Sequence, residues 1–316
     1  MKRLQPRGNH WASLGESTFV AGMWLLYQVH RCLGRWPFLL CLYPVVLYYW
    51  ATRKVARQAS MEYLQRLQSV YGSLGQQPGL RENVHHFMVF AQVILDKMLA
   101  MTGRYRTSRV RFEGRQPLIE RIHSGQGAVV ATAHMGCIEL CQCIAQQRQG
   151  LKLNILVHTK HAARFNRLMA RLAPDSGVQL LQVSEFDAGM ALQLADKVAR
   201  GEFIAIAGDR VPVHDSKTVS VDFLGQPAQF PCGPYVLAAV LKCPLYFMGC
   251  VHEGQGYAVE FVPLAQQVTL PRAQRQQALQ VYATAFAQQV ELMLQRAPYD
   301  WFNFFPFWEQ GSAGKH

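Results

Sequence analysis

The feature that most constrains the fold is an alternation of short apolar runs and helical segments that begins near residue 116. Apolar runs of roughly four to eight residues between longer amphipathic segments are typical of βα units, whose strands pair in parallel beneath covering helices. The expected strands are 128–133, 153–158, 178–182, 203–207, 244–251 and 257–262, and the expected helices are 136–147, 161–172, 189–200, 233–241 and 271–296. The sequence therefore predicts an α/β domain over residues 116–316, with a mixed, largely parallel sheet flanked by helices.

Residues 1–115 lack this alternation and are predicted to form an N-terminal helical, membrane-associated region. Residues 55–100 are expected to be helical, with a loop at 72–79. Before them, residues 36–52 (WPFLLCLYPVVLYYWAT) carry no charge over 17 residues, at the short end of the roughly 17–25 residues that span a bilayer. This run is either a buried helical hairpin or a membrane-embedded or interfacial anchor. We expect the anchor, with its basic flanks on the cytoplasmic side.

The charge of the chain is unbalanced: only 16% of the residues are charged, yet the net charge is +12. Such an excess suits an anionic partner, which could be nucleic acid, a membrane surface or an acidic protein. Seven basic residues and one acidic residue lie in 1–55, around the apolar run. Nucleic-acid binding predicts basic residues interleaved with exposed stacking aromatics instead. We therefore expect an anionic membrane surface as a partner, no nucleic acid, and a monomeric chain.

The stretch most informative about chemistry is ATAHMGCIEL, at residues 131–140. A buried strand leads into His134, then Gly136, then a helix that carries Glu139. On a regular helix the two side chains would point about 140° apart, so they converge only if His134 lies on the turn and Glu139 in the first helical turn. A helix N-terminus disfavours imidazolium, and a carboxylate fixes the tautomer of a histidine that acts as a base. Spacing alone does not decide between this pair and a structural histidine.

Three cysteines follow His134, at positions 137, 141 and 143, and they could suggest a metal site. Their C-x3-C-x-C spacing lacks the second distant pair of structural zinc sites. Cys137 as a covalent nucleophile would have only His134 to activate it. The eight cysteines lie inside apolar segments, which indicates buried thiols in a reducing compartment. We expect no metal and no bound cofactor.

HMGCIEL resembles the H-x4-D/E motif of the lysophospholipid acyltransferase superfamily, and it is most similar to the branch of bacterial late acyltransferases of lipid A biosynthesis. Three later segments match that family in order: GDR at 208–210, VDFLGQPAQFPCGP at 221–234 and PYDWFNFFPFW at 298–308. The resemblance implies a glycerolphosphate acyltransferase-like fold. It also implies transfer of an acyl chain from an acyl thioester, acyl-carrier protein or acyl-CoA, to a hydroxyl of a lipid. His134 would be the general base and Glu139 its orienting partner.

The resemblance further implies a set of substrate-binding residues: Arg167, Asp209, Arg210, Phe223, Gly225, Phe230 and Gly233. Each has a plainer interpretation. Arg164, Arg167 and Arg171 would share one helical face that is either solvated or a phosphate clamp. Asp209 and Arg210 are either a structural ion pair or support for the pocket. The loop at 223–234 either only turns the chain or lines an acyl channel, and the terminal aromatics are either a core plug or an interfacial belt.

The identity of the acceptor stays open, because the chain has Phe304 where the lipid A branch commonly has a histidine after its tryptophan. A lipid A precursor, lysophosphatidate, an aminolipid and an aryl-polyene-type lipid are all compatible with the motifs. The alternative functions are a non-catalytic membrane-bound lipid- or carrier-binding protein and a thioesterase that uses water at the same site. For the acyltransferase, the expected location is the cytoplasmic face of a bacterial inner membrane.

Overall fold

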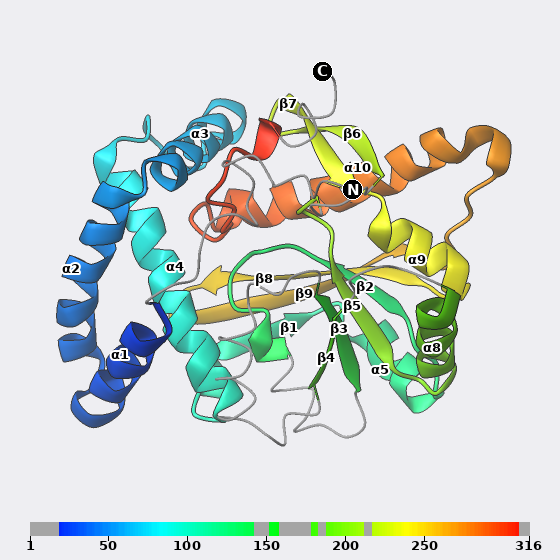
Figure 1. The fold of residues 1–316 in the computed structure, drawn as a ribbon, viewed down its shortest axis with the longest axis horizontal. Helices are drawn as coiled ribbons and strands as arrows, with labels where there is room; N and C mark the ends of the chain where they lie inside the picture. The colour runs from blue at the N-terminus through cyan, green and yellow to red at the C-terminus, as the bar shows by residue number, and fades with distance from the viewer. Residues whose placement is uncertain (1–18, 142–151, 158–177, 183–187, 212–216, 310–316) are drawn as a thin grey trace, which may run out of the picture.

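The computed structural model describes residues 19–141, 152–157, 178–182, 188–211 and 217–309. The described part of the chain begins with four helices: α1 (Phe19–Leu33), α2 (Arg35–Thr52), α3 (Lys54–Tyr71) and α4 (Leu80–Met101). Figure 1 shows them gathered at one end of the molecule, beside the sheet. The predicted helical region at 55–100 is confirmed as α3 and α4, separated by a loop that begins at Gly72, where a left-handed residue ends α3.

The rest of the described chain is built on a seven-stranded sheet with the order β1-β9-β8-β2-β5-β3-β4. Its strands are β1 (Val110–Glu113), β2 (Val129–Thr132), β3 (Leu153–Val157), β4 (Val178–Gln182), β5 (Phe203–Ala207), β8 (Leu245–Glu253) and β9 (Gly256–Ala265). All neighbouring pairs are parallel except β8 and β9, which form an antiparallel pair. The predicted mixed, largely parallel sheet is confirmed.

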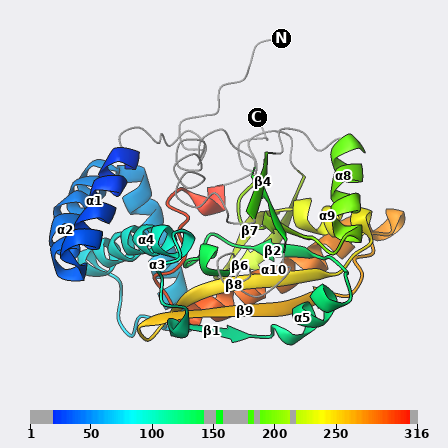
Figure 2. The same ribbon diagram turned by 90° about the horizontal axis from the view of Figure 1, so that it is seen from below.

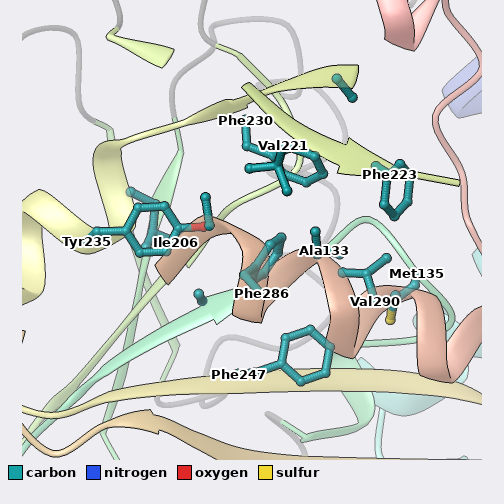
Figure 3. Close-up of a cluster of buried hydrophobic side chains, with 14 of the residues drawn as sticks. Ala133, Met135, Ile206, Val221, Phe223, Phe230, Tyr235, Phe247, Phe286 and Val290 are labelled. Carbon is teal, nitrogen blue, oxygen red and sulfur yellow. The ribbon is translucent and has the colours of Figure 1, made fainter. Parts of the chain in front are cut away.

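Two hydrophobic cores cover the two faces of this sheet. On one face lie α3, α8 (Ala188–Ala199), α9 (Gly233–Leu241) and α10 (Arg275–Arg296), together with a hairpin of β6 (Thr218–Phe223) and β7 (Gln226–Pro231). On the other face lie α4 and α5 (Gln116–His123). Figure 2 shows α10 running along β8 and β9, and Figure 3 shows Phe286 of α10 between Phe247 of β8 and Phe230 of the hairpin.

Two elements differ from the sequence expectation. The strand β1 precedes residue 115, yet it pairs with β9 and forms one edge of the sheet, so the sheet begins before the predicted division of the chain. The division itself stays a prediction. The segment 223–234, expected to be a loop, is largely the hairpin, whose two-residue turn at Leu224 and Gly225 has positive φ at both positions. Such turns match the twist of antiparallel strands, and glycine adopts positive φ without steric cost.

The uncharged run at 36–52 forms most of α2, which is apolar on two sides. Phe38, Leu42 and Val46 are buried against α1 and α4. The exposed side carries Trp36, Leu40, Tyr43, Leu47 and Tyr48. In the described part of the chain, α4 is the helix long and apolar enough to cross a membrane. A core helix of a soluble protein meets the same criteria, so this is weak evidence for membrane association.

Candidate active site

The predicted base His134 lies directly after β2, where the chain turns. Gly136 has a φ of +49°, and a Cβ there would overlap the carbonyl oxygen of Cys250 on the neighbouring strand. Only glycine permits both the conformation and this close approach. Glu139 begins a helical turn three residues later. The local geometry that the sequence predicted, a turn at Gly136 with Glu139 in the first helical turn, is therefore confirmed.

A buried carboxylate from the adjacent strand holds His134 in place. The backbone N–H of His134 donates to Oδ2 of Asp209 over 2.8 Å, and its Nδ1 donates to Oδ1 over 2.7 Å. Asp209 follows β5, which pairs in parallel with β2, so both residues lie at the carboxyl ends of neighbouring strands. This edge is where ligands bind in open α/β sheets. Since a carboxylate only accepts, the Nδ1–Asp209 bond leaves Nε2 of a neutral imidazole as the basic nitrogen.

The prediction that Glu139 orients His134 is wrong. Glu139 forms an ion pair with Lys97 of α4, whereas Nδ1 of His134 is bonded to Asp209. Glu139, five residues after His134, is thus directed at α4. The carboxylate that contacts His134 is Asp209, which lies 75 residues away in the sequence. The side chains of Lys97 and Glu139 are both partly buried, so their pair ties α4 to the turn that carries His134.

The surroundings of His134 and Asp209 favour a neutral imidazole beside an ionised carboxylate. Burial of the imidazole, followed by the nearby guanidinium of Arg210, lowers the pKa of His134 below its usual value, and Asp209 opposes part of this change. Burial would raise the pKa of Asp209, but His134, Arg210 and the hydrogen bonds outweigh it and hold that pKa well below its usual range. A neutral His134 was predicted, although the principal cause is burial rather than a helix N-terminus.

The terminal aromatic segment braces this pair. Nε1 of Trp301 donates to Oδ2 of Asp209 over 3.1 Å, and Nδ2 of Asn303 donates to the same oxygen over 2.8 Å. The backbone N–H of Phe302 donates to the carbonyl oxygen of His134. Trp301 is 1% exposed. For this part of the segment, the core-plug interpretation is confirmed, and the plug also supplies polar contacts to the site.

Arg210, next to Asp209 in the sequence, binds the same terminal segment. Its Nε donates to Oδ1 of Asn303 over 2.7 Å, and a terminal nitrogen donates to the carbonyl oxygen of Phe302 over 2.9 Å. Burial lowers the pKa of Arg210 to about 10, opposed by Asp209, so it stays cationic at neutral pH. The structure therefore places Asp209 and Arg210 together beside His134, and their support of a substrate pocket stays a prediction.

The remaining predicted residues lie in the core, in the hairpin turn, at the start of α9 or outside the described residues. Phe223 and Phe230 are buried in the core of Figure 3, and Phe223 packs against Trp301 at a ring-centroid distance of 5.3 Å. Gly225 lies in the hairpin turn and Gly233 begins α9. A direct contact of these four residues with substrate stays a prediction. Arg167, with its neighbours Arg164 and Arg171, lies outside the described residues.

The cysteine next to the turn at Gly136, Cys137, lacks the properties of a nucleophile. Burial raises the pKa of the Cys137 thiol well above its usual value, which leaves it protonated and unreactive. Cys141 is also buried, and Cys143 lies outside the described residues. In the described part of the chain, no three His, Cys, Asp or Glu side chains are grouped so that they could hold a metal ion.

Comparison with known proteins places this geometry in a family. The sequence matches the family described as bacterial lipid A biosynthesis acyltransferase over residues 81–310. The chain belongs to this family. The lipid A acyltransferase match begins inside α4 and takes in every residue of the His134 network. Lipid acyltransferases are enzymes, so the family assignment identifies the chain as a member of an enzyme family.

Curated relatives support the same class more distantly. The chain is similar to the phosphatidylinositol mannoside acyltransferase of Mycobacterium tuberculosis, in both strain ATCC 25618 / H37Rv and strain CDC 1551 / Oshkosh. The identity is 25% over 185 residues, which cover 58% of this chain and 55% of each relative. The chain thus spans about half the length of the curated relatives it matches.

Sequence reasoning missed the polar members of the terminal segment. Trp301 and Asn303 both donate to Asp209, and Asp300 bonds His252 at the end of β8. A signal was present, because Asp300 and Asn303 interrupt an otherwise aromatic run. Polar side chains in a segment destined for a core need partners there.

Proposed function

We propose that this chain transfers an acyl group from an acyl thioester to a hydroxyl of a lipid acceptor, with His134 as the general base and Asp209 as the residue that orients it. The observation that carries the proposal is the two-point contact of Asp209 with the backbone N–H and Nδ1 of His134. The His134 side chain is still 35% exposed. The imidazole is therefore held in place by Asp209 while part of the ring stays exposed at the edge of the sheet.

The proposed step uses one base twice. Nε2 of His134 takes the proton of the acceptor hydroxyl as the hydroxyl oxygen bonds to the thioester carbonyl carbon. The C–S bond then breaks, and the imidazolium returns the proton to the departing thiolate, which leaves a thiol and an ester. Asp209 stabilises the transient imidazolium without taking the proton itself. General-base catalysis of this kind contributes about 10²–10⁴-fold.

The donor is proposed to be acyl-carrier protein or acyl-CoA, and the acceptor a lipid hydroxyl. Family membership implies an acyl donor and a lipid acceptor without naming either. The basic excess of the chain, +12 overall, would favour the acidic carrier protein or the phosphates of CoA and of the acceptor. No metal or cofactor takes part in the proposed step.

The test is an acyl-transfer assay with the purified full chain, radiolabelled palmitoyl-CoA or palmitoyl-carrier protein, and a panel of lipid acceptors. His134→Ala should abolish transfer, while His123→Ala, a change of an exposed histidine on α5, should leave it unchanged. Retained transfer in His134→Ala would refute the general-base assignment. Hydrolysis of the donor without transfer would favour the thioesterase, and binding without turnover the non-catalytic protein.

We also propose that the exposed apolar side of α1 and α2 lies against the membrane, at the cytoplasmic face of the bacterial inner membrane. Trp36 is 84% exposed and Leu40 78% exposed. A helix that is apolar all round normally buries its whole surface, and exposed apolar patches mark interaction or membrane sites. The exposed Arg31, Arg35 and Arg53 flank this side and would meet anionic headgroups.

Flotation with vesicles of phosphatidylglycerol and phosphatidylethanolamine tests the membrane proposal. The triple variant Trp36→Ser, Leu40→Ser, Tyr48→Ser changes only exposed side chains, so it should keep the fold and lose most vesicle binding. The matched variant Leu192→Ser, Val240→Ser, Val281→Ser changes exposed apolar residues of other helices and should still bind. Equal binding by both variants would place the membrane contact elsewhere.

A further inference from the structure

A second buried histidine, His86 on α4, binds the terminal aromatic segment beside His134. Nε2 of His86 lies 2.9 Å from the carbonyl oxygen of Trp301. The next backbone N–H along the chain, that of Phe302, donates to the carbonyl oxygen of His134 over 2.8 Å. The carbonyl of Trp301 and the N–H of Phe302 belong to one peptide group. A single peptide group therefore connects the two histidines.

This peptide group is a rigid connection. A peptide unit is planar, and in the trans form its C=O and its N–H point in opposite directions. No peptide bond in the described residues is cis. A donor held on the oxygen therefore fixes the direction in which the N–H points on the other side, toward His134. The same donor polarises the peptide group and strengthens the hydrogen bond that its N–H makes.

The partners of His86 determine which of its ring nitrogens donates. A carbonyl oxygen only accepts, so Nε2 carries the proton that is donated to Trp301. Burial lowers the pKa of His86 to about 3, so the ring is neutral at pH 7 and its Nδ1 is an acceptor. Nδ1 lies 2.8 Å from Oγ of Ser60 on α3, whose hydroxyl therefore donates to it. Both ring nitrogens thus have a partner of the required kind.

The hydrogen bonds continue from Ser60 to α2. Oγ of Ser60 accepts from Nδ2 of Asn83 over 3.0 Å, and Oδ1 of Asn83 accepts from Nε1 of Trp50 over 2.6 Å. These three side chains and His86 are called the polar relay here. Each member donates to the next, so the polar relay runs in one direction from α2 through α4 and α3 to the terminal segment. Ser60, Asn83 and His86 are each 1% exposed or less.

The surroundings of His86 are otherwise aromatic. Its ring packs against the rings of Phe304 and Tyr63, with centroids 4.7 and 5.5 Å apart. Burial of a polar group costs free energy unless the group is paired, and an apolar side chain would fill such a place without that cost. An apolar side chain could not, however, donate to the carbonyl of Trp301. The donor at Nε2 is therefore what distinguishes a histidine at this position.

We propose that the polar relay positions His134 for acyl transfer, with His86 as the positioning residue that acts through the peptide group between Trp301 and Phe302. This inference rests on the proposed function. The held segment contacts both members of the proposed catalytic pair, because the indole of Trp301 donates to Asp209 and the N–H of Phe302 binds the backbone of His134. Figure 1 shows the segment, coloured red, between the N-terminal helices and the rest of the chain.

Loss of the donor at His86 would release the carbonyl of Trp301 and let the peptide group rotate. Both contacts with the pair would weaken, and His134 would keep its chemistry but lose part of its orientation. Orientation of a reacting group acts on the transition state rather than on substrate binding, so kcat falls while KM stays. A relay with a purely structural role would instead change stability and leave kcat of the folded enzyme unchanged.

The test separates the two ring nitrogens of His86. In His86→Gln the side-chain amide reaches the Nε2 position and can donate to Trp301, whereas in His86→Asn it reaches only the Nδ1 position, opposite Ser60. Ser60→Ala breaks the polar relay one step earlier. The matched control is Leu279→Ala, which truncates a buried side chain of α10 outside the relay. All are assayed with the donor and lipid acceptor that the wild type uses best, at a temperature where thermal unfolding shows them folded.

We expect His86→Asn to lower kcat by about tenfold, the loss of roughly one hydrogen bond, with each KM within about twofold of the wild type. His86→Gln should recover most of that loss. Ser60→Ala should lower kcat by about threefold alone and no further when combined with His86→Asn, because members of one network are not additive. Leu279→Ala should lower the melting temperature and keep kcat. Unchanged kcat in His86→Asn, an equal loss in His86→Gln, or additive losses in the double variant would overturn the proposal.

A second measurement does not depend on turnover. In protein labelled with ¹⁵N-histidine, the ring signals of His134, assigned with His134→Ala, report which nitrogen carries the proton. The wild type should show the Nδ1–H form that Asp209 holds, and His86→Asn a mixture of both forms. Ser60→Ala should show a smaller change of the same kind, and it decides the question if His86→Asn does not fold.

The two measurements keep the two proposals apart. Identical His134 signals in the wild type and in the relay variants would overturn the positioning by His86, whatever the activity. If the wild type transfers no acyl group but its His134 signals differ from those of His86→Asn, the proposed acyl transfer fails while the positioning of His134 stands.

Discussion

Asp209→Asn separates orientation of the base from stability of the fold. Three donors converge on Oδ2 of Asp209, namely the backbone N–H of His134, Nε1 of Trp301 and Nδ2 of Asn303, whereas Oδ1 accepts from Nδ1 of His134. An asparagine would therefore keep its oxygen at the Oδ2 position and turn its NH₂ group toward Nδ1. The imidazole would then have to present a lone pair at Nδ1 and carry its proton on Nε2.

That exchange of tautomers removes the base without removing the histidine. The loss expected in kcat/KM is about 10³–10⁴-fold, close to the roughly 10⁴-fold loss of kcat found when the carboxylate of a catalytic triad is changed in the same way. At 1.36 kcal/mol per tenfold, this is about 4–5.5 kcal/mol of transition-state stabilisation. Stability should fall less, by about 1–3 kcal/mol, because one charge-assisted hydrogen bond is lost and three acceptor contacts stay.

The assay is steady-state acyl transfer at pH 7.5, run beside thermal unfolding and beside Glu139→Gln. Because Glu139 pairs with Lys97, its substitution leaves the His134–Asp209 bond in place and should cost much less activity than Asp209→Asn. If Asp209→Asn keeps more than about a tenth of the wild-type rate, or if Glu139→Gln loses more activity than Asp209→Asn, the argument for Asp209 as the orienting residue is refuted.

Three further predictions follow from neighbours of this network. Arg210→Gln removes a positive charge that lowers the pKa of His134, so the acidic limb of the pH profile of kcat/KM should move to higher pH, and an unmoved limb would contradict this. His86 of α4 is buried, and its Nε2 lies 2.9 Å from the carbonyl oxygen of Trp301. Burial lowers the pKa of His86 to about 3, so the unfolded state binds the proton first on acidification. The free energy of unfolding should fall between about pH 6.5 and 3 by up to about 1.4 kcal/mol per pH unit, and chemical denaturation of His86→Gln should show a shallower slope. Gly136→Ala should lose several kcal/mol or most activity, because its Cβ would overlap the Cys250 carbonyl, and a normal melting temperature with normal kcat would disprove the constraint.

The sequence was sufficient to predict most of the sheet, for a physical reason. Short β-branched and apolar runs between amphipathic segments have few alternatives to βα units, and β2, β3, β4 and β5 lie within one or two residues of their predicted bounds. The position of His134 was predictable in the same way, since a histidine at the end of a buried strand and a glycine two residues on are both local features. The hairpin of β6 and β7 was missed because its prolines and glycines are also typical of loops.

The orienting partner of His134 could not be predicted locally. Asp209 and His134 meet because β5 pairs with β2, and strand order is a property of the whole chain. The nearby Glu139 satisfied every local criterion and still pairs with α4. Spacing in the sequence pointed to Glu139, whereas Asp209 was expected to support the pocket, and the parallel pairing of β5 with β2 brings Asp209 to His134.

The terminal segment shows how one extended stretch can contact two histidine–aspartate pairs. Successive side chains of an extended segment point to opposite sides, and 300–303 follows this rule: Trp301 and Asn303 donate to Asp209, whereas Asp300 accepts from His252. The packing of the aromatic side chains alternates in the same way, because Trp301 belongs to the core on the α10 face and Phe302 to the core on the α4 face. A shift of this segment by one residue would exchange the two sets of partners and break both pairs at once. The dense aromatic packing that fixes its register is therefore part of how both histidines are held, which explains why a run of buried rings lies at the edge of the sheet where chemistry is expected.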